Sequence, residues 1–337
     1  DAVLDEIQRR MLDDHDMVRL WVGPGGDDGK GRVVAHDARP AHGRVSEIFA
    51  TRDVFTNGRR LMMLIQGSGA VRPGQWARSL CINDSLADGS MLPMIAAFRA
   101  AGYSVVVLNP NVRTVEAADG REVAIPGSSG RSSHSVSVWE TVVARSPAAE
   151  VGVVAHSAGG AQLCGLARHL DDKASDASLS ELGRIKAVAF TDAVHMLDKR
   201  DSRSLLTWAS ATIVDWVASG KPRDTVISGR GRDGIRELSA GHRKHEWTTA
   251  AAMPSILAFF EARMSPLPAA SAEGVSGGAG SGGSTAEAAT GHVTGPTTPE
   301  RSDGGAGVGA GGAGSAAAGA TGDTAEVVDT CAADGAS

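Results

Sequence analysis

The sequence predicts an α/β fold in which helices cover both faces of a mostly parallel sheet. Apolar runs at 60–66 and 104–108 have no polar alternation, which is typical of strands buried on both sides. Segments such as 91–103 carry apolar residues at helical spacing instead. Strands that alternate with amphipathic helices indicate a parallel sheet.

The expected elements follow one another in a regular order. Val3, Ile7 and Met11 predict an opening helix. The expected strands are 17–22, 45–50, 60–66, 104–108, 151–156, 185–192 and, more weakly, 235–241. The expected later helices are 91–103, 135–146, 158–170, 204–219 and 253–264.

The composition changes sharply near Ser265. From there to Ser337 the chain has no aromatic residue, a single Leu and 18 of its 43 glycines. Such a segment buries too little apolar surface to offset its ordering entropy. We therefore expect a folded domain over 1–264 and a disordered tail over 265–337.

Charge and cysteine content exclude several classes of protein. Of the net charge of −6, the tail contributes −7, so residues 1–264 carry +1 and lack the basic excess of a nucleic-acid-binding surface. A locally basic stretch is more simply explained as a solvated loop than as an anion site. It consists of Arg230, Arg232, Arg236, Arg243 and Lys244. No apolar run reaches the ~20 residues of a membrane helix.

Three scattered cysteines fit a reducing compartment, nuclear or cytoplasmic. The chain begins with Asp1 rather than Met, so a cleaved N-terminal leader is left as an open alternative.

The stretch "VGVVAHSAGG" (151–160) resembles a nucleophile elbow, with Ser157 at the turn between a strand and a helix. Small residues at Ala155 and Gly159 allow the two backbones to approach closely. A serine hydroxyl needs an imidazole base, and that base needs a carboxylate. Asp192 and His245 supply both in the chain order of α/β-hydrolases, each just after a strand. Because ligands bind beyond the carboxyl ends of parallel strands, we expect all three at one edge.

Other assignments stay open. His242 and then His195 are the alternative bases, and Asp215 and Asp224 the alternative acids. Backbone N–H groups of Ala158 and of Gly67 or Ser68 are candidates for an oxyanion hole. The turn is equally compatible with a purely structural role and an inert serine. No metal site is expected, since His242 and His245 lack a partner at ligand spacing. No cofactor is expected, because no phosphate-binding loop or dinucleotide fingerprint occurs.

Several longer stretches resemble one family. "LIQGSGAVRPGQWARSLCINDSLADGSMLPMI", "GYSVVVLNPN", "VVAHSAGG", "AVAFTDAVH" and "SAGHRKHEWTTAAAMPSILAFF" are similar to the Argonaute-binding protein 2 (Arb2) domain, shared with the FAM172 family. The resemblance covers nearly all of 1–264, and the segment 67–83 is its most specific part.

The resemblance implies an α/β-hydrolase fold and links to Argonaute or chromatin-associated proteins, small-RNA-directed heterochromatin and cotranscriptional regulation. It places the family's serine, acid and histidine on Ser157, Asp192 and His245. Two positions depart from the family: Gln66 stands where His is usual, and Ala158 where an aromatic is common. The charged insertion that some members carry before Val138 is also missing, which weakens any partner contact made through it.

Two functions follow. The first is a nuclear binding module on a hydrolase scaffold, which rests on analogy because fold does not fix function. The alternative is an active serine esterase or acyl hydrolase that uses Ser157, Asp192 and His245.

Overall fold

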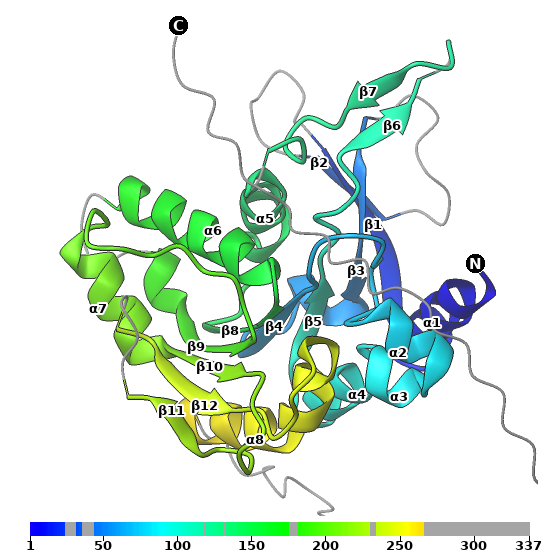
Figure 1. The fold of residues 1–337 in the computed structure, drawn as a ribbon. Helices are drawn as coiled ribbons and strands as arrows, with labels where there is room; N and C mark the ends of the chain where they lie inside the picture. Colours follow the sequence, from blue (N-terminus) through cyan, green and yellow to red (C-terminus); the bar gives the residue numbers. More distant parts are fainter. Residues whose placement is uncertain are drawn as a thin grey trace, which may run out of the picture. The chain divides into compact units, whose positions relative to one another are not determined.

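The computed structural model describes residues 1–23, 32–35, 44–117, 119–130, 132–174, 181–229 and 234–265. These residues belong to a compact unit over Asp1–Ser271 (Figure 1). The predicted tail lies outside the described residues from position 266 onward, as do Arg230 and Arg232 of the basic stretch.

A sheet of ten strands is the centre of the fold, in the order β11-β12-β10-β9-β8-β4-β5-β3-β1-β2. The five pairings from β12 to β5 are parallel, and the outer pairings at both ends are antiparallel. The strands are β1 (Met17–Gly23), β2 (Arg32–Ala35), β3 (Ser46–Thr51), β4 (Arg60–Ile65), β5 (Ser104–Val107), β8 (Glu150–His156), β9 (Ile185–Thr191), β10 (Ile213–Val217), β11 (Val226–Ser228) and β12 (Arg236–Ser239). A separate hairpin pairs β6 (Thr114–Glu116) with β7 (Glu122–Ala124).

Helices pack on both faces of the sheet, as the sequence predicts (Figure 1). One face carries α5 (Ser133–Val138), its π-helical continuation Trp139–Val143, α6 (Gly159–Lys173) and α7 (Arg203–Thr212). The other carries α1 (Ala2–Asp13), α2 (Arg78–Asn83), α3 (Leu86–Gly89), α4 (Leu92–Ala100) and α8 (Thr248–Arg263).

Strand β4 shows why the central strands are continuously apolar. Leu61, Met63 and Ile65 join the core under α5–α7, whereas Met62 and Leu64 join the core under α4 and α8. Successive side chains of a strand point to opposite faces of the sheet. When helices cover both faces, every side chain is buried and the strand is apolar throughout. The predicted mostly parallel, α/β-hydrolase-like fold is confirmed.

Two predicted elements were wrong in extent. The helix expected over 204–219 ends at Thr212, and 213–217 form β10 between β9 and β12. The β-branched and aromatic residues Ile213, Val214, Trp216 and Val217 gain more from burial in the sheet than from continuing the helix.

The last helix begins at Thr248 rather than near 253. Proline is most common in the first turn of a helix, because it has no N–H to donate to the preceding turn. In the structure, Pro254 lies inside α8, and the helix continues through it.

Candidate active site

Ser157 lies at the turn between β8 and α6. Its backbone φ is +53°, a left-handed conformation that side-chain-bearing residues seldom adopt. Three backbone hydrogen bonds hold the turn: the Ser157 N–H donates to Thr191 O (3.2 Å), and Ser157 O accepts from the N–H groups of Gly160 (3.1 Å) and Val194 (2.8 Å). The turn is therefore fixed by the last residue of β9 and by the loop that follows it.

Glycines allow this turn to approach the neighbouring strand. A Cβ at Gly159 would lie 2.5 Å from Ile65 O, closer than real Cβ atoms come, and at a tight 3.1 Å from Gln66 O. A Cβ at Gly67 would lie 3.0 Å from Ser157 Cβ and 3.4 Å from its Oγ. The Gly-rich loop after β4 thus lies directly against the Ser157 side chain.

Asp192 and His245 form a hydrogen-bonded pair at the same edge of the sheet. Asp192, with a φ of +49°, follows β9, and His245 begins the short helical turn His245–Trp247 before α8. Asp192 Oδ2 lies 2.6 Å from His245 Nδ1, and Asp192 Oδ1 accepts a hydrogen bond from the Ala218 N–H (3.0 Å). The carboxylate is thus held from two sides.

The pair shifts the pKa of both members. Burial acts to raise the pKa of Asp192, but hydrogen bonds from His245 and Ala218 outweigh it, and the pKa lies below its usual value. The hydrogen bond to Asp192 raises the pKa of His245, against a smaller opposing effect of burial. An imidazole oriented through Nδ1 by a carboxylate leaves Nε2 as the atom that would accept a proton.

Ser157 is close to this pair without being bonded to it. The ring of His156, the residue before Ser157, lies 4.6 Å from the ring of His245, centroid to centroid. Among the residues that the structure describes, no hydrogen bond joins the Ser157 hydroxyl to His245. The structure therefore brings Asp192 and His245 into contact and leaves Ser157 beside them.

His156 is a member of the site that the sequence patterns did not indicate. Its Nδ1 lies 2.9 Å from Thr191 O and 3.3 Å from Thr249 Oγ1. Burial, helped by the charge of His245, lowers the pKa of His156 to about 4, so the ring is neutral at physiological pH. In the sequence, the position of His156 directly before Ser157 is the feature that could have indicated its place in the site.

The alternative bases His195 and His242 contact residues other than Asp192. His195 Nε2 is 3.6 Å from Asp215 Oδ2, and burial raises the pKa of that carboxyl. The His242 ring packs on Trp247 at 5.1 Å.

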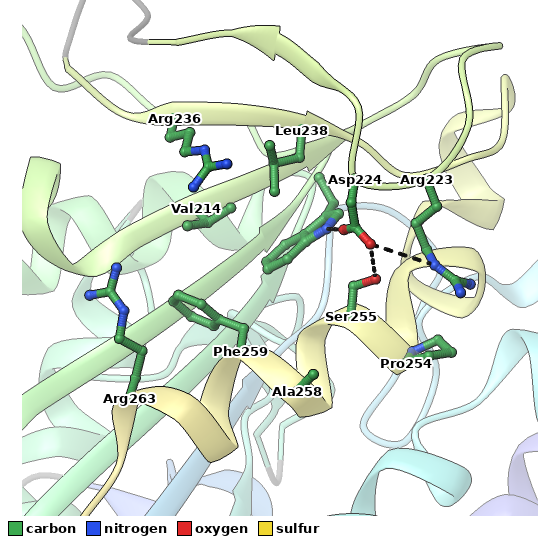
Figure 2. A pocket seen from close by; sticks show the side chains of 11 residues that line it. Val214, Arg223, Asp224, Arg236, Leu238, Pro254, Ser255, Ala258, Phe259 and Arg263 are labelled. Atoms are coloured by element: carbon green, nitrogen blue, oxygen red, sulfur yellow. Dashed lines mark hydrogen bonds and ion pairs between the residues drawn. The ribbon is translucent and has the colours of Figure 1, made fainter.

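Asp224 lies elsewhere and serves a different set of partners. It accepts hydrogen bonds from Trp216 Nε1 (2.8 Å) and Ser255 Oγ (2.6 Å), in a pocket between β12 and α8 (Figure 2). Both of its carboxylate oxygens are thereby engaged away from His245.

The candidate oxyanion donors lie where the sequence places them, at the elbow and on the loop after β4. In the described part of the chain, none of the N–H groups of Gly67, Ser68 and Ala158 donates to a backbone carbonyl. Asn111 braces the loop, because its Nδ2 donates to Gly67 O (2.8 Å) and Val71 O (3.1 Å). Gln66 is fully buried, and within the described residues neither amide atom of its side chain has a hydrogen-bond partner.

The described residues contain no group of three or more His, Cys, Asp or Glu side chains arranged to hold a metal ion. No helix within them has the length and apolar character needed to cross a membrane.

Together, the sheet, the elbow and the Asp–His pair define an α/β-hydrolase-like protein. The chain belongs to the Arb2 domain family, whose model matches residues 33–223.

Two of the three relatives described next are named as cotranscriptional regulators. The cotranscriptional regulator ARB2A homolog of Dictyostelium discoideum is 34% identical over 243 residues, which cover 63% of this chain and 61% of that protein. Cotranscriptional regulator ARB2A of Homo sapiens is 31% identical, with 66% and 64% covered. A FAM172 family protein homolog of Caenorhabditis elegans is 30% identical, with 66% of each chain covered. The chain thus spans slightly under two thirds of these relatives.

Solved structures are similar only at low identity. A histone deacetylase from Saccharomyces cerevisiae gives a TM-score of 0.44 at 13% identity, covering 77% of this chain and 96% of that chain. A poly(3-hydroxybutyrate) depolymerase from Bordetella parapertussis gives 0.37 at 14% identity, covering 68% and 88%.

Proposed function

We propose that this chain is a binding module on an α/β-hydrolase scaffold that acts in cotranscriptional regulation in the nucleus. The observation that carries the proposal is family membership together with relatives named as cotranscriptional regulators. The family resemblance points further, to an Argonaute or chromatin-associated protein as the partner and to small-RNA-directed heterochromatin as the setting. Direct nucleic-acid binding is not part of the proposal, because residues 1–264 are nearly neutral.

A binding role is consistent with the geometry at Ser157, because it needs no hydrogen bond between the serine hydroxyl and a base. Within the described residues His245 is hydrogen-bonded to Asp192 and not to the Ser157 hydroxyl. The elbow also has a structural use, since the Ser157 N–H bonds the end of β9 and its carbonyl bonds the loop that follows.

The proposal is tested by capture of partners on the full chain. Immobilised protein is incubated with nuclear extract, and Argonaute is quantified in the eluate by immunoblotting, beside the Ser157→Ala variant. We expect enrichment by both proteins, because the proposed role uses the surface and not the hydroxyl. Absence of Argonaute and of chromatin proteins from both eluates would remove the proposal's support.

A serine hydrolase is the second candidate function. The 2.6 Å contact between Asp192 and His245 favours it, together with the donors near Ser157 that have no backbone acceptor. The three residues would then act as nucleophile, orienting acid and base. Labelling by a fluorophosphonate separates this candidate from the binding module, because the reagent reacts only with an activated serine.

A further inference from the structure

Asp215 is a carboxylate inside the apolar sheet. It lies on β10 and is 1% exposed. Its neighbours Val214 and Trp216 belong to the core under α4 and α8, whereas Ile213 belongs to the core under α5–α7. Because side chains alternate along a strand, Asp215 points to the same face as Ile213. An apolar side chain of similar size would avoid the cost of burying a carboxylate, so the packing of β10 does not account for Asp215.

The contacts of Asp215 are with the loop that follows β9. The Ala193 N–H donates to both carboxylate oxygens, at 3.3 Å to Oδ2 and 3.5 Å to Oδ1. His195 Nε2 lies 3.6 Å from Asp215 Oδ2, and the His195 ring stacks on Phe190 at 5.6 Å. The carboxylate therefore meets this loop at two residues, Ala193 and His195.

Three successive N–H groups join this loop to its surroundings. They are the N–H of Asp192, which donates to Trp216 O (2.9 Å), that of Ala193, which donates to Asp215, and that of Val194, which donates to Ser157 O (2.8 Å). The first two acceptors are neighbours on β10, and the third is in the elbow. Two of the acceptors are backbone carbonyls, so Asp215 is the acceptor that a substitution can remove.

The bond from Ala193 holds the peptide unit that follows Asp192. The φ of Asp192 is +49°, a left-handed conformation that costs free energy for a residue with a Cβ. Such a backbone persists where surrounding contacts hold it. Here the Asp192 N–H is bonded to β10 on one side, and the Ala193 N–H is bonded to Asp215 on the other. The direction of the Asp192 side chain depends on the same backbone.

Asp215 also acts on the site through its charge. Burial raises the pKa of Asp215, the neighbouring His195 imidazole acts in the opposite direction, and the charge of Asp192 adds to the rise. The hydrogen bond to Asp192 is the main cause of the raised pKa of His245, and the charge of Asp215 makes a smaller contribution. An effect of Asp215 on His245 can therefore run through space or through the backbone at Asp192.

We propose that Asp215 is a positioning residue of the candidate site. It holds the peptide unit after Asp192, and this sets the direction in which Asp192 presents its carboxylate to His245. The proposal goes beyond the proposed function, because it concerns the Asp192–His245 pair and needs neither a protein partner nor a reactive serine.

The test is an NMR titration of His245 in the full chain and in two variants. Asp215→Asn removes the charge and keeps a carbonyl oxygen for the Ala193 N–H, whereas Asp215→Leu removes both at similar volume. We expect the proton affinity of His245 to be about threefold lower in Asp215→Leu than in Asp215→Asn, the weakening that a hydrogen bond out of position gives. Equal pKa values of His245 in the two variants would overturn the proposal, because Asp215 would then act by its charge alone.

Two controls separate positioning from a general loss of structure. Asp224→Asn, the same change at the carboxylate bonded to Trp216 Nε1, should leave the pKa of His245 unchanged. In an Asp192→Asn background, Asp215→Leu and Asp215→Asn should have equal effects on His245, because the carboxylate to be positioned is gone. A difference that persists in that background would contradict the proposal.

If Asp215→Leu fails to fold, the parent protein decides the question. Protonation of Asp215 weakens its bond to the Ala193 N–H, so the amide resonances of Asp192 and Ala193 should shift together. We expect a common midpoint above pH 3.8, since burial raises the pKa of Asp215. A shift of the Ala193 amide alone would overturn the proposal.

Discussion

His245 Nδ1 lies 2.6 Å from Asp192 Oδ2, although the two residues are separated by 53 positions in the chain. The contact arises because both residues follow strands that end at the same edge of the sheet. Asp192 leaves β9 with a positive φ, and His245 follows β12, the strand beyond β10. The contact brings a carboxylate and an imidazole together at the edge of the sheet where the Ser157 turn lies.

The pair makes a titration prediction. The pKa of His245 in the folded protein should lie above 6.5 and should fall in Asp192→Asn, which removes the negative charge. The measurement is an NMR titration of the imidazole protons, with Asp13→Asn as a control at an exposed carboxylate. An unchanged pKa in Asp192→Asn would contradict the contact.

The same shifts predict how stability depends on pH. The raised pKa of His245 stabilises the fold below about pH 6.5, and this contribution is lost as the pH rises through the folded pKa. The lowered pKa of Asp192 stabilises the fold above about pH 3.8, and this contribution is lost as the pH falls through the folded pKa. Thermal melts across pH 5 to 9 should therefore show a smaller decline with rising pH in His245→Ala than in the parent. Parallel curves for the two proteins would refute this.

Gly159 gives a prediction about the turn itself. In Gly159→Ala, the new Cβ would meet Ile65 O at 2.5 Å, and backbone cannot move aside cheaply. We expect a loss of about 1–3 kcal/mol in the free energy of unfolding, measured with urea. Gly58→Ala is the control, since a Cβ at Gly58 meets no atom within 4 Å. Equal stability of the two variants would mean that α6 does not approach β4 so closely.

Labelling by a fluorophosphonate tests the hydrolase candidate. If Ser157 is activated, labelling should be abolished by Ser157→Ala and slowed about 10²- to 10⁴-fold by His245→Ala, the contribution of a positioned general base. If the chain is a binding module, the parent protein should resist the reagent as completely as Ser157→Ala does. Mass spectrometry of the adduct identifies the residue that reacts.

Much of the architecture can be predicted from the sequence, because strands buried on both faces appear in it as continuous apolar runs. The apolar runs that became β4, β5, β8 and β9 are covered on both faces, so they carry no polar alternation. Strand β10 was missed for the opposite reason: it follows α7 without a turn residue, and Asp215 interrupts its apolar run. Its buried place between β9 and β12 depends on partners that are distant in the chain.

The candidate site was predictable where chemistry restricts residue type and order. Chain order and position after strands indicate Ser157, Asp192 and His245, and in the structure Asp192 and His245 lie 2.6 Å apart. His156 and Asn111 could not be chosen in this way. Their roles come from the Thr191 carbonyl and the Gly67 carbonyl, and a sequence gives no sign of which backbone atom a side chain will meet.

The proposed binding module engages a regulatory protein partner without using Ser157 as a nucleophile. The most direct measurement is the dissociation constant of purified Argonaute for the full chain and for Ser157→Ala, determined side by side by surface plasmon resonance. We expect measurable binding with dissociation constants that agree within about twofold, a difference of ~0.4 kcal/mol. No binding by either protein, or loss of binding in Ser157→Ala alone, would contradict it.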